Sequence, residues 1–165
     1  MQELVSESLS IVGEELAISF DDIRAMLERY AEDGGNSQTM EKCLGLLHSV
    51  NGVLRMTETY GASLLTEEME ETCRFLEKSK SNKTAAHEAL EALSRAVVQL
   101  PSYVELIING ERDMPLVLLP LLNDLRAVRG KPLLSESTLL LLNLSSDKDQ
   151  PGEGDDREPS GEEWE

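Results

Sequence analysis

Apolar residues recur every three or four positions through most of the chain, and short polar segments separate the periodic stretches. From residue 8 to residue 32 this spacing predicts an amphipathic helix with one buried face. Gly13 weakens the pattern, so residues 1–12 are predicted to fray or to form a separate piece. The residues on the predicted inner face are Leu9, Val12, Leu16, Ile23, Leu27 and Tyr30.

Three more helices follow with the same spacing. The second is predicted over residues 39–57 with Ser37 or Thr39 as its cap, the third after the corner at Tyr60-Gly61, and the fourth from a cap at Thr84. Pro101 is expected to break or kink the fourth helix, because proline removes a backbone donor and clashes with the preceding turn. Four antiparallel helices joined by short loops bury these stripes most simply, which predicts an all-α four-helix bundle.

Hydrophobicity rises and then falls sharply after this bundle. Residues 113–130 are apolar almost all round, which predicts a helix that is buried or docks on a partner, with a bend at Pro120. A leucine run at 139–142 follows. Residues 145–165 carry nine acidic and two basic residues, a composition typical of disorder. The predicted organisation is a helical bundle over 1–110, an apolar helix and extension over 111–144, and a disordered acidic tail over 145–165.

Charge and cysteine usage narrow the class of protein. The 165-residue chain has a formal net charge of −17, so nucleic acid and anionic lipid are unfavourable partners. No apolar run approaches the roughly 20 residues that cross a bilayer, and no secretory signal is visible. Cys43 and Cys73 both fall on apolar stripes, which indicates buried thiols and a cytoplasmic location.

His48 is the strongest candidate for chemistry. It lies on the flank of the second predicted helix, and Gly45 and Gly52 stand one turn to either side with no side chain to cover the ring. A neutral imidazole is a nucleophile near pH 7, as reversible phosphorylation requires. The alternative is a histidine that lies on the flank of the helix and has no chemical role. His87, on the polar side of the fourth helix, is predicted to be an ordinary surface residue.

The residues around His48 resemble a known family. The segment 48–52, HSVNG, resembles the His-x-x-x-Gly signature of histidine phosphotransfer domains. Two longer stretches, 46–70 and 115–136, resemble the N-terminal phosphotransfer-like domain of the large chemosensory histidine kinases that control type IV pili and twitching motility. The resemblance covers about residues 8–137. It implies a phosphotransfer-type bundle with His48 as the phosphoacceptor.

The same resemblance raises a difficulty at Asn51. Phosphotransfer domains usually carry lysine three residues after the histidine, and that position is Asn51 here, followed by the signature's Gly52. Arg55, on the same face, is the residue expected to compensate. A glutamate of the next helix holds the ring in chemotaxis kinases. Glu67 or Glu70 could serve in that role, but a solvated acidic face is the simpler account of the glutamates at 67, 68, 70 and 71.

Two functions remain open at this stage. In the first, a histidine kinase catalytic domain phosphorylates His48, which passes the group to an aspartate of a response-regulator receiver domain. ATP and Mg²⁺ would be bound by those partners, and no cofactor or metal is expected in this chain, which has no Walker loop and no kinase core. In the second, a phosphotransfer-like scaffold without that chemistry binds proteins of the pilus signalling complex through its apolar segments at 114–128 and 139–142.

Overall fold

The computed structural model describes residues 2–148, and within them the side chains of residues 4–142. Every regular element in this range is a helix, as the apolar spacing predicts. The first four helices are long and are joined by loops of three or four residues. They are α1 (Gln2–Glu32), α2 (Ser37–Met56), α3 (Tyr60–Ser79) and α4 (Lys83–Ile108).

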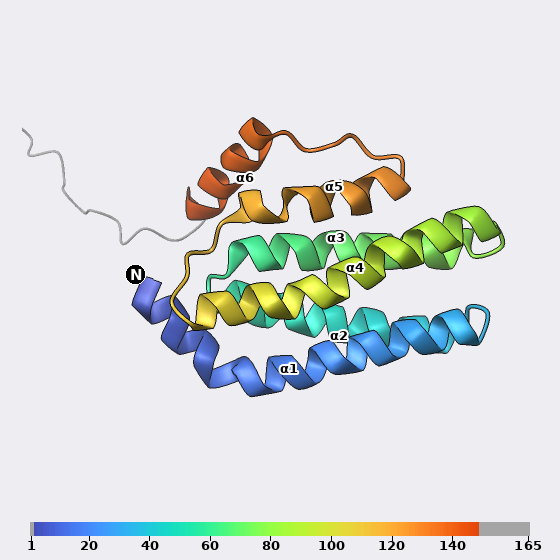
Figure 1. The fold of residues 1–165 in the computed structure, drawn as a ribbon, viewed down its shortest axis with the longest axis horizontal. Helices are drawn as coiled ribbons and strands as arrows, with labels where there is room; N and C mark the ends of the chain where they lie inside the picture. Colours follow the sequence, from blue (N-terminus) through green and yellow to red (C-terminus); the bar gives the residue numbers. More distant parts are fainter. Residues whose placement is uncertain (1, 149–165) are drawn as a thin grey trace, which may run out of the picture.

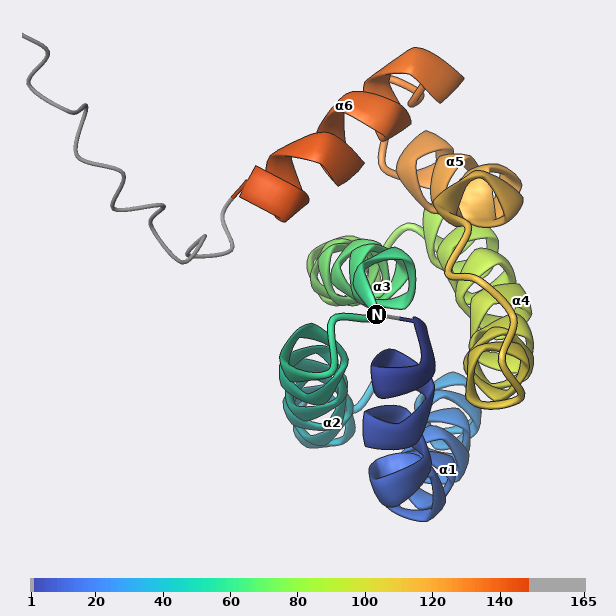
Figure 2. The ribbon, with the colours of Figure 1, turned by 90° about the vertical axis from the view of Figure 1, so that its left-hand side faces the viewer.

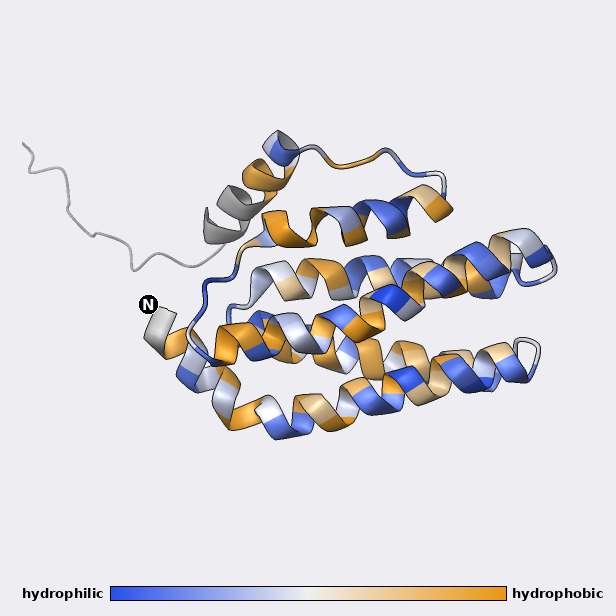
Figure 3. Cartoon of the chain, viewed as in Figure 1, coloured by the Kyte–Doolittle hydropathy of each residue, from blue (hydrophilic) through white to orange (hydrophobic). Residues whose placement is uncertain are grey.

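These four helices form an antiparallel bundle. Each helix packs on the helices before and after it in the chain, and α4 closes the ring by packing on α1 (Figures 1 and 2). The apolar stripes meet along the axis, where Leu47, Leu65 and Leu93 are completely buried. Figure 3 shows the polar residues on the outer sides of the same helices. The all-α bundle predicted from the sequence is therefore confirmed.

The ends of the helices differ in detail from the prediction. Asn36 caps α2 by accepting hydrogen bonds from the backbone N–H groups of residues 38 and 39, and Asn82 caps α4 by accepting one from Ala85. The predicted caps at Ser37, Thr39 and Thr84 are wrong, because an asparagine precedes each of them and its carboxamide reaches the same donors. The corner between α2 and α3 is formed by residues 57–59, so the Tyr60-Gly61 pair begins α3.

Two helices continue without a break through the residue at which the sequence predicted an interruption. Helix α1 runs through Gly13 to its start at Gln2, although its first turns are bent away from the rest (Figure 1). Glycine suits this position because a Cβ there would lie 3.1 Å from the Cδ1 atom of Ile108 in α4. Helix α4 likewise continues through Pro101 to residue 108. Packing of both helices against their neighbours outweighs the local cost of these residues.

The segment after the bundle folds as three short elements. A 3₁₀ turn, η1 (Pro115–Leu118), leads into α5 (Leu119–Val128), and α6 (Glu136–Lys148) follows. Helix α5 packs on α3 and α4, while α6 contacts η1 and α3 (Figure 2). The single helix predicted over 113–130 is thus divided, because Pro115 and Pro120 each occupy a first turn and their missing N–H groups shorten the regular α-helix.

The predicted start of the acidic tail needs one correction. Residues 145–148 belong to α6, whereas the prediction assigned them to a disordered tail. Residues 149–165 lie outside the described part of the chain, so disorder there stays a prediction. Among the described residues, no helix combines the length and the apolar character that crossing a lipid bilayer requires.

Candidate functional site

His48 lies near the middle of α2 with 81% of its side chain exposed. A Cβ atom at Gly45 or at Gly52 would have nothing within 4 Å, so helix packing gives no reason for glycine at either position. Both glycines leave the surface around the imidazole open. The prediction that this ring is at least partly exposed is confirmed.

Glu70 of α3 is the acidic group that faces this ring. Its Oε2 atom lies 3.8 Å from Nδ1 of His48, beyond hydrogen-bond length, so the contact is an ion pair only when the imidazole is protonated. The same oxygen lies 3.3 Å from Arg74. Only 7% of the Glu70 side chain is exposed, and its Oε1 atom is buried without a hydrogen-bond partner among the described residues. Leaving such an atom unpaired costs about 1–3 kcal/mol, which marks Glu70 as unusual for a surface helix.

The four glutamates of α3 do not form one solvated face. Glu68 and Glu70 are buried, whereas Glu67 and Glu71 are at least partly exposed. Glu68 binds Arg126 of α5 at 2.8 Å and also Arg129, the residue that directly follows α5. The interpretation as a uniformly solvated acidic face is therefore wrong for two of the four residues, because α5 covers one of them and α2 covers the other.

Asn51 points into the bundle instead of toward solvent. It is 8% exposed, and its Oδ1 atom accepts a hydrogen bond from the hydroxyl of Ser63 at 2.5 Å. Arg55 lies 3.4 Å from Glu67, so its charge is shared with a carboxylate. The guanidinium groups of Arg55 in α2 and Arg74 in α3 are thus both paired with glutamates.

The other histidine and the two cysteines form no reactive site. His87 is exposed on α4, as predicted. Cys43 and Cys73 are both buried and free, as predicted from their positions on the apolar faces of α2 and α3. The neighbouring Cys43 thiol, together with burial, raises the pKa of Cys73 and keeps it neutral. In residues 2–148, no group of three or more His, Cys, Asp or Glu side chains is arranged to hold a metal ion.

An apolar groove lies where η1 meets α6. Its volume is about 300 Å³, and its lining residues are Arg112, Asp113, Met114, Pro115, Leu116, Leu139 and Leu140. Leu139 is buried and attaches α6 to the domain, while Met114, Leu116 and Leu140 remain largely exposed. This groove belongs to the apolar segments that the sequence offers as a binding surface, and the structure leaves their outer side uncovered.

Asp113 fixes the start of this groove on the bundle. Its Oδ2 atom accepts a hydrogen bond from the backbone N–H of Gly61 at 3.0 Å, and its other oxygen accepts one from the hydroxyl of Tyr103. Burial raises the pKa of Asp113 in spite of these hydrogen bonds. A side chain on Gly61 would collide with the Asp113 carboxylate. The absence of a side chain at Gly61, in the pair that the sequence suggested as a corner, thus makes this long-range contact possible.

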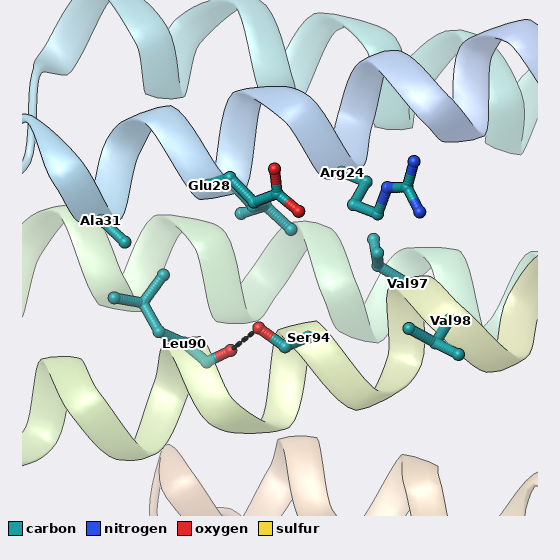
Figure 4. Close-up of a pocket in the computed structure, with 8 residues that line it drawn as sticks. Arg24, Glu28, Ala31, Leu90, Ser94, Val97 and Val98 are labelled. Atoms are coloured by element: carbon teal, nitrogen blue, oxygen red, sulfur yellow. Dashed lines mark hydrogen bonds between the residues drawn. The ribbon is translucent and has the colours of Figure 1, made fainter.

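A second hollow lies between α1 and α4 and has a volume of about 210 Å³ (Figure 4). Leu27, Val97 and Val98 supply apolar surface, and Arg24 and Glu28 reach it from α1. The hydroxyl of Ser94 donates to the backbone carbonyl of Leu90 in its own helix at 2.8 Å. The polar side chains that line this hollow form no nucleophile–base pair, so the hollow offers no catalytic arrangement.

Comparison with known proteins bears on the choice between the two functions. The chain is similar to a scaffold protein. This relative is scaffold protein FimL of Pseudomonas aeruginosa, which is 28% identical over 130 residues. The matched region is 79% of this chain but only 23% of FimL, so the chain spans less than a quarter of that relative. No protein-family model matches the chain, and no solved structure matches it.

Proposed function

We propose that this chain is a protein-binding scaffold module of a cytoplasmic signalling complex that controls type IV pili. The observation that carries the proposal is the apolar groove between η1 and α6, whose exposed leucine and methionine side chains have the character of a docking surface. The similarity to a scaffold protein supports a binding role, and the resemblance to pilus-controlling chemosensory kinases supports the pathway.

The charge of this region fits a partner with an apolar contact surface. Residues 111–142 carry four acidic and four basic residues, whereas the whole chain has a net charge of −17. Neutral apolar surface is therefore concentrated here. Burying it would contribute about 25 cal/mol for each Å² removed from water, a driving force that does not depend on salt. The occupant of the groove is then a protein of the pilus signalling complex that presents an apolar segment.

A photocrosslinking experiment tests this proposal. A photoreactive amino acid at Val117, which is exposed on η1, should capture a component of the pilus signalling complex in cells. The same amino acid at Met56, exposed at the end of α2, is the matched control and should not capture it. With the purified partner, Val117→Ser combined with Leu140→Ser should weaken binding about tenfold or more. Equal capture at both positions, or unchanged affinity, would contradict a docking groove.

One observation favours phosphotransfer by His48 as a second function. The exposed ring directs Nδ1 toward the buried carboxylate of Glu70, which leaves Nε2 on the solvent side. In such a reaction Nε2 would form a bond to the γ-phosphorus of ATP bound by a kinase domain, and ADP would leave. The phosphoryl group would then pass to a receiver aspartate beside that domain's Mg²⁺. The paired state of Arg55 and the burial of Asn51 leave little positive charge to hold the group, which is why the scaffold function is preferred.

Radiolabelling separates the two functions. The purified chain is incubated with its kinase, ATP and Mg²⁺, with a known substrate as a positive control for the kinase. A phosphotransfer domain would be labelled, and His48→Gln would abolish the label while His87→Gln, the matched surface control, would keep it. We expect no label at His48 if the chain acts only as a scaffold. Label that is lost with His48→Gln would make phosphotransfer the primary function.

A further inference from the structure

The groove between η1 and α6 presents one exposed charge among apolar side chains. Five of its lining residues are apolar, and the remaining two are Arg112 and Asp113. The Asp113 carboxylate is engaged by the bundle, since Gly61 and Tyr103 donate hydrogen bonds to its two oxygens. Arg112, in contrast, is exposed. Its guanidinium is therefore the charged group that the groove offers to an occupant.

Arg112 has no charge partner within the described part of the chain. Its side chain makes no hydrogen bond or ion pair with residues 4–142. The other two arginines of the segment after the bundle, Arg126 and Arg129, both bind Glu68. A guanidinium carries five N–H donors in a planar fork that matches a carboxylate. Arg112 is thus available to pair with an acidic group of another molecule.

The charge of the rest of the chain makes this position selective. The net charge of −17 repels an acidic partner from most of the surface, and α1 alone carries eight acidic and two basic residues. Residues 111–142 instead balance four acidic residues with four basic ones. Of these four basic residues, Arg112 is the one that lines the groove. An acidic partner is accepted best at this place.

The surroundings of the groove favour a helix as the occupant. Every regular element in residues 2–148 is a helix, so this part of the chain has no sheet edge to which a strand could be added. The volume of about 300 Å³ is at the lower end of the range for ligand pockets, about 300–1,000 Å³, so the groove holds a few side chains. A helix presents such side chains on one face, three and four residues apart.

We propose that the groove selects an acidic amphipathic helix of the partner. Its leucine-type side chains contact Met114, Leu116 and Leu140, and a glutamate or aspartate beside them pairs with Arg112. The proposal rests on the docking function proposed above and adds the charge and the form of the partner. Apolar contact supplies most of the affinity, while the charge pair fixes the orientation of the helix in the groove. Apolar surface around the pair excludes water and strengthens it relative to a fully exposed pair.

Three synthetic peptides test the preference for an acidic helix on the full chain. Each is a helix of about 14 residues, roughly four turns, with leucines on one face. They differ at two positions on one flank of the leucines, which hold glutamate, glutamine or lysine. At a salt concentration of about 0.15 M, charges more than about 8 Å away are largely screened, so the comparison reports the local pair. Fluorescence anisotropy should show the glutamate peptide binding about tenfold more tightly than the glutamine peptide, and the lysine peptide binding most weakly.

Charge variants of the chain assign this preference to one residue. Arg112→Gln should weaken the glutamate peptide about tenfold and leave the glutamine peptide unchanged. Arg112→Glu should reverse the order, so that the lysine peptide binds most tightly. The matched control is Arg29→Gln, because Arg29 is an exposed arginine of α1 that also makes no ion pair with residues 4–142. This control should change each affinity less than about twofold.

Apolar variants assign the remaining affinity to the groove. Met114→Ser combined with Leu140→Ser should weaken all three peptides about tenfold, since both side chains line the groove and are largely exposed. Met56→Ser combined with Val98→Ser removes exposed apolar side chains elsewhere and should change each affinity less than about twofold. Circular dichroism and thermal unfolding verify that each variant is folded.

The outcomes separate this proposal from the docking function on which it rests. Equal binding of the three peptides, no binding of the glutamate peptide, or an unchanged order in Arg112→Gln would overturn the selection of an acidic helix. The docking function would still stand if the photoreactive amino acid at Val117 captures its partner. Self-association of the chain that Met114→Ser with Leu140→Ser abolishes would assign the groove to a second copy, and this outcome also contradicts the proposal.

Discussion

Arg129, which directly follows α5, binds Glu68 of α3, and at least nine-tenths of each side chain is buried. Arg126 reaches the other oxygen of the same carboxylate at 2.8 Å. A carboxylate withdrawn from water is stable only when cations and hydrogen bonds replace its hydration. The three charged residues therefore attach α5 to the bundle as one unit, and with α5 they position η1, where the groove begins.

Replacing Glu68 with glutamine should destabilise the chain strongly. The change leaves Arg129 buried without a negative partner, and removing one member of a buried pair costs about 3–5 kcal/mol. Urea unfolding followed by circular dichroism measures the loss. Glu67→Gln is the matched control on the same helix, because its pair with Arg55 is solvent-exposed and contributes about 0–1 kcal/mol. Equal losses in the two variants would contradict a special role for Glu68.

The Asn51–Ser63 hydrogen bond should be measurable as a coupling between α2 and α3. Asn51→Ala and Ser63→Ala each remove one partner, and each should reduce the free energy of unfolding by about 1–2 kcal/mol. The double variant should lose about 1 kcal/mol less than the sum of the two single losses, since the bond can be lost only once. Strict additivity in a double-mutant cycle would show that the two groups do not interact.

Asp113 should make stability depend on pH in an unusual direction. Burial raises its pKa above the ordinary 3.8, so the folded chain holds this proton more tightly than the unfolded chain does. The contribution of this proton to the free energy of unfolding is fully present below the pKa that Asp113 has in the unfolded chain. It is lost as pH rises through the higher pKa that Asp113 has in the folded chain. The free energy of unfolding of the parent, minus that of Asp113→Asn, should therefore fall as pH rises from about 4. A difference that grows over this range would contradict a raised pKa.

The side chain of Leu139 should hold α6 against the domain but contribute little to the stability of the four-helix bundle. It is buried, whereas Leu140 beside it is 59% exposed. Leu139→Ala should raise hydrogen–deuterium exchange in residues 136–148 and in η1, because the few contacts of α6 depend on this side chain. Exchange in α2 and α3 should change little. Leu140→Ala is the control and should leave exchange in α6 close to that of the parent.

Much of the bundle was predictable from the sequence because amphipathic periodicity is a local property. Leu47, Leu65 and Leu93 lie on the predicted faces and are all in the core. The exposure of His48 was predictable for the same reason, since its angle on the helix and the glycines beside it are fixed by the sequence. Helix boundaries were less accurate, because several neighbouring polar residues can cap a helix and the sequence does not show which one does. Asn36 and Asn82 act as caps where Ser37, Thr39 and Thr84 were predicted.

The sequence by itself determined which residues face inward along each helix, and therefore the all-α bundle and the open ring of His48. Only the tertiary structure decided which of the α3 glutamates has which partner. Glu70 faces His48 and Glu68 faces α5, because the packing of α2 and α5 against α3 brings groups together across as many as 61 positions of the chain.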